Sequence, residues 1–351
     1  HQGSFRSERI FSITMTTAAS EENLVMPEEP LLQVRDLRTY FETEGGTAKA
    51  VNGVDFDIRK GEVLGLVGES GSGKTVTALS VLRLVPDPPG KIVTGSVHYK
   101  GRNLLQLTWD EIRQVRGKDI SMIFQEPMTS LNPVFSIGVQ VSEVILAHEA
   151  CSRAEAFDRS VRMLELVGIP DAKLRMRDYP HHFSGGMRQR VMIAIALACN
   201  PSLLIADEPT TALDVTIQAQ ILELIVQVRA QQAEAAVLLI THNLGVVAET
   251  CDRVMVMYGG KIQEVAPVDK IFSGALHPYT QGLLASLPRI DGDRAERLKT
   301  IPGIVPSIHD LPSGCKFCTR CDMKVDECDT VEPELIEVAP GHLVRCHLVN
   351  A

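Results

Sequence analysis

The sequence predicts an α/β fold built around a largely parallel sheet. Short apolar runs at 63–68, 202–209 and 236–242 have the length and composition of buried strands. Segments with the spacing of amphipathic or buried helices lie between them. Buried strands that alternate with helices indicate parallel pairing, and the chain's 351 residues allow one such domain and a smaller appendage.

The first half of this domain is predicted to hold strands on both sides of a glycine-rich turn. Its first ordered residues alternate in the manner of a strand, and a second alternating run follows. The third run is continuously apolar and breaks into glycines. The predicted elements are strands at 31–41, 50–58 and 63–68, a helix at 74–85, and mixed strands and turns at 92–124.

The second half is predicted to be helical first and then to return to strands. Beyond about 275, prolines, charged residues and cysteines dominate and the periodicity fades, which indicates a boundary near 275–290. The predicted elements are helices over most of 134–200, a strand at 202–209, an amphipathic helix at 218–232, a strand at 236–242, and a hairpin at 253–265 that turns at Gly259 and Gly260.

Composition narrows the possible functions. The net charge of −9 argues against a nucleic-acid binder, because such a protein typically has a basic surface. No apolar run reaches the roughly 18 residues that span a bilayer, and the first residues lack a secretory apolar region. We therefore expect a soluble, cytosolic protein, with residues 1–30 as a disordered leader and Met15 as a candidate initiator.

Residues 68–75, GESGSGKT, fit the phosphate-binding pattern G-x-x-x-x-G-K-[ST] between a buried strand and a helix. The glycines let the backbone turn its N–H groups toward phosphate, and the helix N-terminus adds positive potential. Lys74 is expected at the β- and γ-phosphates, and the Thr75 hydroxyl at Mg²⁺. The predicted ATP contacts in this segment are Gly68, Ser70, Gly71, Ser72, Gly73, Lys74, Thr75 and Thr77.

Residues 203–209, LLIADEP, supply a complementary pair of carboxylates. An apolar strand delivers them to the carboxyl edge of the sheet, where ligands bind in such folds. Asp207 is predicted to hold Mg²⁺ as part of the ATP site, and Glu208 to polarise the attacking water.

Four further motifs lie in the order found in the ATPase subunits of ABC transporters, which the chain resembles over 31–270. They are MIFQEP at 122–127 with Gln125, FSGGMRQR at 183–190, TTALD at 210–214 ending in Asp214, and LLITHN at 238–243 with His242. The resemblance implies a P-loop ABC ATPase at 31–275, with a RecA-like core, an antiparallel β subdomain and a helical subdomain at about 126–190.

The resemblance also implies roles for single residues. Gln125 is expected near Mg²⁺ and the reacting phosphate, and His242 at the γ-phosphate. Ser184, Gly185, Gly186 and Asp214 are expected to contact the ATP held by a partner subunit, because two ATP molecules are sandwiched between two such chains. Phe41 is predicted to stack on adenine, with Tyr40 as the alternative; a role in the core is the other interpretation of both rings.

Residues 125–143, 277–288 and 341–347 narrow the resemblance to the D-type ATPase subunit of dipeptide, oligopeptide or nickel importers. In these systems two different ATPase subunits pair beneath two permeases, on the cytoplasmic face of the inner membrane, and an extracytoplasmic binding protein delivers the solute. We expect dipeptides or oligopeptides as the solute. The alternatives are import of nickel or another small solute, a soluble ABC ATPase that acts on nucleic acid or the ribosome, and a redox-gated regulator.

A cysteine cluster marks the C-terminal region, 276–351. By spacing alone, Cys315, Cys318 and Cys321 resemble the local run of a bacterial ferredoxin, with Cys328 or Cys346 as the fourth ligand. In a cytosolic chain such clustered thiols bind metal more often than they form disulfides.

The family resemblance favours a different ligand set. It implies a [4Fe–4S] cluster on Cys315, Cys321, Cys328 and Cys346, with Cys318 left out and a structural role for the cluster. Tetrahedral Zn²⁺ is the first alternative, with His309, His342 and His347 nearby, and reduced free thiols are the second. The other cysteines, Cys151, Cys199 and Cys251, are expected to be ordinary core thiols.

Overall fold

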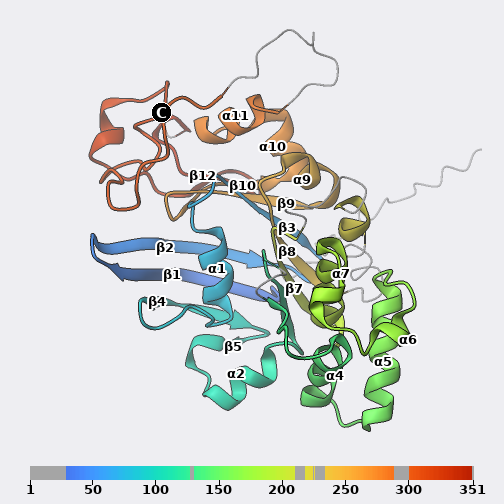
Figure 1. Ribbon diagram of the computed structural model, residues 1–351. Coiled ribbons are helices and arrows are strands. Elements are labelled where there is room, and N and C mark those ends of the chain that lie inside the picture. Colours follow the sequence, from blue (N-terminus) through green and yellow to red (C-terminus); the bar gives the residue numbers. More distant parts are fainter. Residues whose placement is uncertain are drawn as a thin grey trace, which may run out of the picture.

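The computed structural model describes residues 29–126, 130–209, 218–223, 225, 234–287 and 300–349. Two sheets and several groups of helices make up this part of the chain (Figure 1). The larger sheet has the strand order β11-β12-β10-β9-β3-β8-β7-β6, and the smaller one β2-β1-β4-β5. The leader predicted at 1–30 lies, up to residue 28, outside the described residues.

The larger sheet confirms the predicted parallel core. β3 pairs in parallel with β8 and β9, and β7 pairs in parallel with β6 and β8. β10 then runs antiparallel to β9, in the predicted hairpin. The strands of this part are β6 (Ile120–Ile123), β7 (Leu203–Asp207), β8 (Ala236–Ile240), β3 (Val63–Val67), β9 (Arg253–Tyr258) and β10 (Lys261–Pro267).

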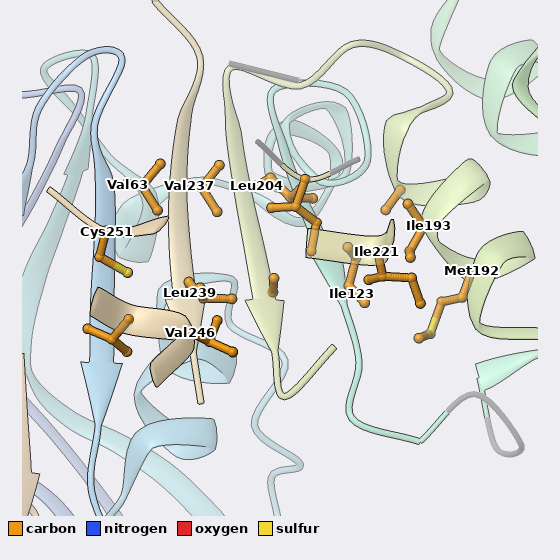
Figure 2. Packing of buried hydrophobic residues seen from close by; sticks show 14 of the residues in the cluster. Val63, Ile123, Met192, Ile193, Leu204, Ile221, Val237, Leu239, Val246 and Cys251 are labelled. Carbon is orange, nitrogen blue, oxygen red and sulfur yellow. The ribbon is translucent and has the colours of Figure 1, made fainter. Parts of the chain in front are cut away.

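Both faces of the parallel strands are buried, which explains their continuous apolar runs. Along β7, Leu204 and Ala206 face one cluster of buried side chains, and Leu203 and Ile205 face the other. On the first face, Val63, Val237 and Leu204 lie in a row across β3, β8 and β7 (Figure 2). The helices that contribute to this first face include α7 (Gly185–Leu197), α9 (Leu244–Thr250) and α10 (Val268–Gly274).

The smaller sheet and helix α1 cover the second face. The strands of the smaller sheet are antiparallel, and the predicted strands at 31–41 and 50–58 are confirmed. Thr39 on β1 joins Ser80 on α1 through a hydroxyl–hydroxyl hydrogen bond of 2.7 Å. The elements are β1 (Leu32–Thr43), β2 (Gly46–Ile58), α1 (Lys74–Val81), β4 (Gly90–Tyr99), β5 (Arg102–Asn103), the 3-10 turn η1 (Leu104–Gln106) and α2 (Trp109–Val115).

A helical layer lies between β6 and β7 in the sequence, as predicted for 134–200. The Ser152 side chain and Glu155 form a reciprocal capping box at the start of α5, which explains where that helix begins. The predicted helix at 218–232 lies mostly outside the described residues. The elements of the layer are α4 (Ile137–His148), α5 (Arg153–Leu166), α6 (Ala172–Arg175), the 3-10 turn η2 (Pro180–His182) and α7.

The C-terminal region continues the larger sheet, which the sequence did not predict. β12 pairs with β10 and β11 pairs with β12, so this region lies directly beside the β9–β10 hairpin (Figure 1). Strands of three and four residues are too short to show a period in the sequence. The elements are α11 (Pro278–Ala285), the 3-10 turn η3 (Asp326–Asp329), β11 (Ile336–Ala339), β12 (His342–Val344) and the 3-10 turn η4 (His347–Val349).

Glu264 on β10 anchors this region. Its carboxylate is fully buried and accepts hydrogen bonds from the backbone N–H groups of Leu276, at 2.7 Å, and His277, at 3.1 Å. It also lies 2.7 Å from Nε2 of His342 on β12. One buried carboxylate therefore joins β10, β12 and the segment that leads into α11. Among the described helices, none is both long and apolar enough to cross a membrane.

We expect Glu264→Gln to lower the free energy of unfolding by about 1–3 kcal/mol, because an amide has one acceptor oxygen where the buried carboxylate has two. Urea unfolding followed by circular dichroism measures the loss. Glu165→Gln, on the exposed side of α5, is the control and should change stability by less than about 0.5 kcal/mol. Equal stability of the two variants would contradict the anchoring role.

Candidate functional site

The phosphate-binding loop connects β3 to α1 in a conformation that requires glycine at two positions. Gly68 has φ 154°, and a Cβ there would lie 2.2 Å from the Met257 carbonyl oxygen. Gly73, which caps α1, has φ 104°, and its Cβ would lie 2.3 Å from the Ala50 carbonyl oxygen. The backbones of β9 and β2 therefore lie so close to the loop that no residue larger than glycine fits at these two positions.

Lys74 points back along this loop. Its Nζ donates to the carbonyl oxygens of Gly68, at 2.8 Å, and Glu69, at 3.0 Å. Burial lowers the pKa of Lys74, and the nearby carboxylates of Glu208 and Asp207 oppose that shift. The ammonium group is thus held inside the loop and beside the two carboxylates that end β7.

Asp207 has the environment of a cation ligand. Only 1% of it is exposed, and it shares a side-chain hydrogen bond with Thr75. Its Oδ1 is buried and has no hydrogen-bond partner within the described part of the chain. Burial raises the pKa of Asp207 to about 6. A buried carboxylate oxygen without a partner, next to a hydroxyl, fits Mg²⁺, which prefers hard oxygen ligands.

Glu208, Gln125 and His242 come together at the carboxyl edge of the sheet. Nε2 of Gln125 donates to Glu208 Oε2 at 3.2 Å, and Nδ1 of His242 lies 3.4 Å from the same oxygen. The Glu208 backbone N–H donates to the Ile240 carbonyl at 2.9 Å. The three side chains follow three neighbouring parallel strands, β6, β7 and β8, which explains their convergence.

Glu208 also has a left-handed backbone, with φ 45°. A non-glycine residue rarely adopts this conformation, and such residues cluster at functional sites. Its neighbour Pro209 accepts a 2.7 Å hydrogen bond from the buried amide of Gln189 on α7. The segment that carries Glu208 is therefore held from the helical layer as well as from the sheet.

The predicted signature segment opens α7. Ser184 caps the helix, with its hydroxyl accepting from the Met187 N–H at 3.3 Å. Ser184 and Gly185 are exposed, and Gly186 is half-buried. These residues face solvent at a helix N-terminus, where backbone N–H groups favour an anion.

Two predicted ATP contacts, Thr77 and Phe41, have contacts within the chain itself, and their roles toward ATP stay predictions. Thr77 is buried, and its hydroxyl donates to the Gly73 carbonyl at 2.9 Å, so it supports the loop from behind. Phe41 is half-buried beside Gly90, and the Tyr40 hydroxyl donates to Asn52 at 2.9 Å. Asp214 lies outside the described residues. The structure therefore leaves the choice between Phe41 and Tyr40 as a prediction.

The predicted metal or cluster site on the cysteines is not supported. Among the residues that the structure describes, no three His, Cys, Asp or Glu side chains are arranged to hold a metal ion. Burial raises the pKa of Cys315 to about 12 and also raises those of Cys321 and Cys346; the nearby Cys328 raises all three further. The raised pKa values belong to the metal-free chain, in which the protonated thiol is favoured; a metal binds the thiolate, so its binding would release these protons.

The histidines of the zinc alternative make other contacts. His342 is bound to Glu264, and Nε2 of His347 lies 2.9 Å from the Val331 carbonyl oxygen. Nε2 of His309 lies 3.3 Å from the Thr43 hydroxyl, on the β1–β2 hairpin. Cys318 stands apart from the other thiols in one respect, because its Sγ contacts Asp329 at 3.8 Å.

Sequence reasoning missed two contacts at this site. It assigned no role to Gln189, although the residue lies in the quoted motif FSGGMRQR. It also assigned no role to Glu69, which occupies a variable position of GESGSGKT and pairs with Arg320 in the C-terminal region. Neither contact joins residues close in sequence, so no local pattern could have indicated it.

The raised pKa of Asp207 predicts a pH dependence of stability in the nucleotide-free protein. The carboxyl binds its proton more tightly in the folded state, at about 6, than in the unfolded state, at 3.8. Between these values the folded state holds more protons, so its stability should fall as pH rises, by up to about 3 kcal/mol. Asp207→Asn should remove this slope in urea titrations at pH 4–7; an unchanged slope would contradict the raised pKa.

Comparisons with known protein families match two parts of the chain. Residues 51–211 match the family model described as ABC transporter. Residues 263–328 match the model described as the C-terminal region of oligopeptide/dipeptide transporters.

Whole relatives and solved structures agree with these matches. The oligopeptide transport ATP-binding protein AppD of Bacillus subtilis is 53% identical, over 91% of this chain and 96% of its own length. The dipeptide transport ATP-binding protein DppD of the same organism is 49% identical, over 91% and 95%. A dimeric ATP-binding cassette solved in a post-hydrolysis state with ADP and phosphate matches with a TM-score of 0.61 and 25% identity, covering 68% of this chain and 98% of its own.

The phosphate loop, the carboxylates at the end of β7 and the exposed start of α7 all lie within the residues that match the ABC transporter model. This chain belongs to the family of ABC-transporter ATP-binding proteins that carry the oligopeptide/dipeptide transporter C-terminal region.

Proposed function

We propose that this chain binds and hydrolyses ATP and thereby energises the import of dipeptides or oligopeptides through a membrane permease. The observation that carries the proposal is the convergence of Gln125 and His242 on Glu208, at the sheet edge that also holds the phosphate loop. Relatives at 49–53% identity are named as dipeptide and oligopeptide transport proteins, which supports peptide as the solute.

The geometry supports a separate role for each of these residues in ATP binding and hydrolysis. The loop N–H groups and Lys74 bind the β- and γ-phosphates. Asp207, Thr75 and Gln125 would hold Mg²⁺, and the ion would neutralise charge on the phosphate oxygens. Glu208 accepts a proton from the attacking water, and His242, at 3.4 Å, orients that carboxylate and the γ-phosphate.

A second ATPase chain completes the nucleotide site in this proposal. Ser184, Gly185 and Gly186 form a solvent-facing helix N-terminus on a chain that already has one phosphate loop. Two chains arranged head to tail, each offering this segment to the other's ATP, use both anion sites. The solved relative is dimeric, which supports such pairing. We propose a different ATPase subunit as the partner, with Asp214 at the interface.

The membrane partners are two permease subunits and an extracytoplasmic peptide-binding protein, with this chain bound peripherally at the cytoplasmic face. The segment after Gln125 exposes apolar side chains, with Val134 70%, Phe135 49% and Val139 50% exposed. Exposed apolar groups in one segment are typical of a protein interface. They support permease contact here.

For the cysteines we propose that Cys315, Cys321, Cys328 and Cys346 hold a [4Fe–4S] cluster once deprotonated, within a C-terminal region at 276–351 that follows an ATPase domain at 31–275. The thiol of Cys318 contacts Asp329 at 3.8 Å, which supports leaving it out of the ligand set, although its thiol is also near Cys315 and Cys328. The cluster would supply crosslinks to a segment with little regular structure. Zn²⁺ on the same thiols is the alternative.

Glu208→Gln tests the catalytic assignment. We expect ATP binding to persist and turnover to fall at least about 100-fold, because an amide cannot accept the water's proton. A dimer with the partner subunit, closed by ATP and detected by size-exclusion chromatography, should accumulate. Glu165→Gln serves as the exposed control, with parental activity. Parental hydrolysis and transport by Glu208→Gln would refute the role of Glu208.

Iron and acid-labile sulfide, measured on anaerobically purified protein, test the cluster. Cys346→Ser should lose most of the iron, whereas Cys318→Ser and the control Cys151→Ser should retain it. The reverse pattern, with iron lost in Cys318→Ser and kept in Cys346→Ser, would support the ferredoxin-like set. Parent protein with zinc alone, or with no metal, would rule out the cluster.

A further inference from the structure

The C-terminal region reaches the phosphate loop through one buried cation. Arg320 donates from its two terminal nitrogens to the Glu69 carboxylate, at 2.6 Å and 3.1 Å. Only 4% of the Arg320 side chain is exposed, against 28% for Glu69. Glu69 is the residue directly after Gly68 in the loop, so this bidentate ion pair ties the C-terminal region to the phosphate site itself.

Arg320 is held in place from several sides. Its Nε donates to the Pro302 carbonyl at 3.0 Å, which leaves the terminal nitrogens facing Glu69. The guanidinium lies 5.8 Å from the ring centre of Tyr258 and 6.0 Å from that of Phe317. Such a stacked, planar cation is pre-organised for a carboxylate.

The Glu69 backbone is held from the same side. Its N–H donates to the hydroxyl of Tyr279 on α11 at 2.8 Å, and Tyr279 is fully buried against Tyr258 and Phe317. The carbonyl of Glu69 in turn accepts from Lys74 Nζ at 3.0 Å. One residue of the loop thus connects the C-terminal region to the lysine that serves the phosphates.

The negative charge of Glu69 opposes the binding of phosphate by the loop. A carboxylate beside an anion-binding loop repels the polyphosphate of ATP, and its field is weakened only if a cation lies close to it. Arg320 is such a cation, and because the pair is largely buried, salt screens it less than it screens an exposed pair.

We propose that Arg320 is a positioning residue for the nucleotide site: it neutralises Glu69 and, with Tyr279, fixes the phosphate loop, so that the C-terminal region sets the affinity for ATP. This inference rests on the ATP-binding function proposed above. A purely structural alternative is that Arg320 only fastens the C-terminal region through Pro302 and the aromatic rings. The two differ in what happens when Glu69 loses its charge.

The experiment measures binding of Mg²⁺ with a non-hydrolysable ATP analogue to the full chain by calorimetry. The variants are Arg320→Gln, Arg320→Lys, Glu69→Gln and the double variant Glu69→Gln/Arg320→Gln. Lys324→Gln is the matched control, because Lys324 is a cation of the same region that pairs with Asp329 at 2.8 Å rather than with the loop. Circular dichroism checks that each variant is folded.

We expect Arg320→Gln to weaken binding about tenfold, the scale of one uncompensated charge within about 10 Å of the phosphates. The double variant should return to within about twofold of the parent, and the loss in Arg320→Gln should be smaller for AMP than for the ATP analogue. Arg320→Lys should bind more tightly than Arg320→Gln, and Lys324→Gln should match the parent. Glu69→Gln alone should bind more tightly than the parent, because it removes the repelling carboxylate and leaves the Arg320 cation. Parental or weaker binding by this variant would contradict the inference even if Arg320→Gln does not fold.

Parental affinity of Arg320→Gln, or a double variant as weak as Arg320→Gln, would overturn the inference and support the structural alternative. Either result would leave the ATP-binding function intact, because the parent would still bind the analogue. Failure of the parent itself to bind Mg²⁺ and the analogue would instead refute the proposed function, and with it this inference.

Discussion

The site depends on one constraint, which is the parallel alignment of short strands buried on both faces. β6, β7 and β8 end at the same edge of the sheet, so Gln125, Glu208 and His242, which follow them, must meet there. β3 ends beside them and leads into the phosphate loop. The two apolar clusters that cover the sheet hold this alignment, which is why a catalytic arrangement drawn from distant parts of the sequence can be kept within hydrogen-bond distance.

Elements whose sequence carries a recognisable local pattern could be predicted from the sequence. The apolar runs of β3, β7 and β8, the glycines at 68–75 and the β9–β10 hairpin each carry a pattern within a few residues, and the structure has them at those places. The strands β11 and β12 could not be predicted in this way, because β12 forms by pairing with β10 and β11 by pairing with β12. The same holds for the bond between Gln189 and Pro209, which depends on how α7 lies against the sheet.

The cysteine segment shows the opposite case. Its strong local pattern predicted a metal site that the structure by itself does not support. Spacing and resemblance both predicted a metal, but the described residues contain no group of three side chains arranged to hold one, and the backbone supplies order of its own. The Cys315 N–H donates to the Cys328 carbonyl at 2.8 Å, and the Lys316 ammonium group donates to three carbonyl groups, those of Pro312, Ser313 and Gly314. These hydrogen bonds order the segment without a bound ligand.

The pairing of β12 with β10 has a consequence for how the chain can be divided. Without β12, the hydrogen-bonding groups of β10 that face away from β9 would be open, and an open strand edge invites pairing with another chain. A fragment that stops near 275 would also leave the buried Glu264 carboxylate without His342, Leu276 and His277. The C-terminal region therefore shields the ATPase sheet against self-association, and an ATPase fragment cut at the apparent boundary is a poor surrogate for the whole protein.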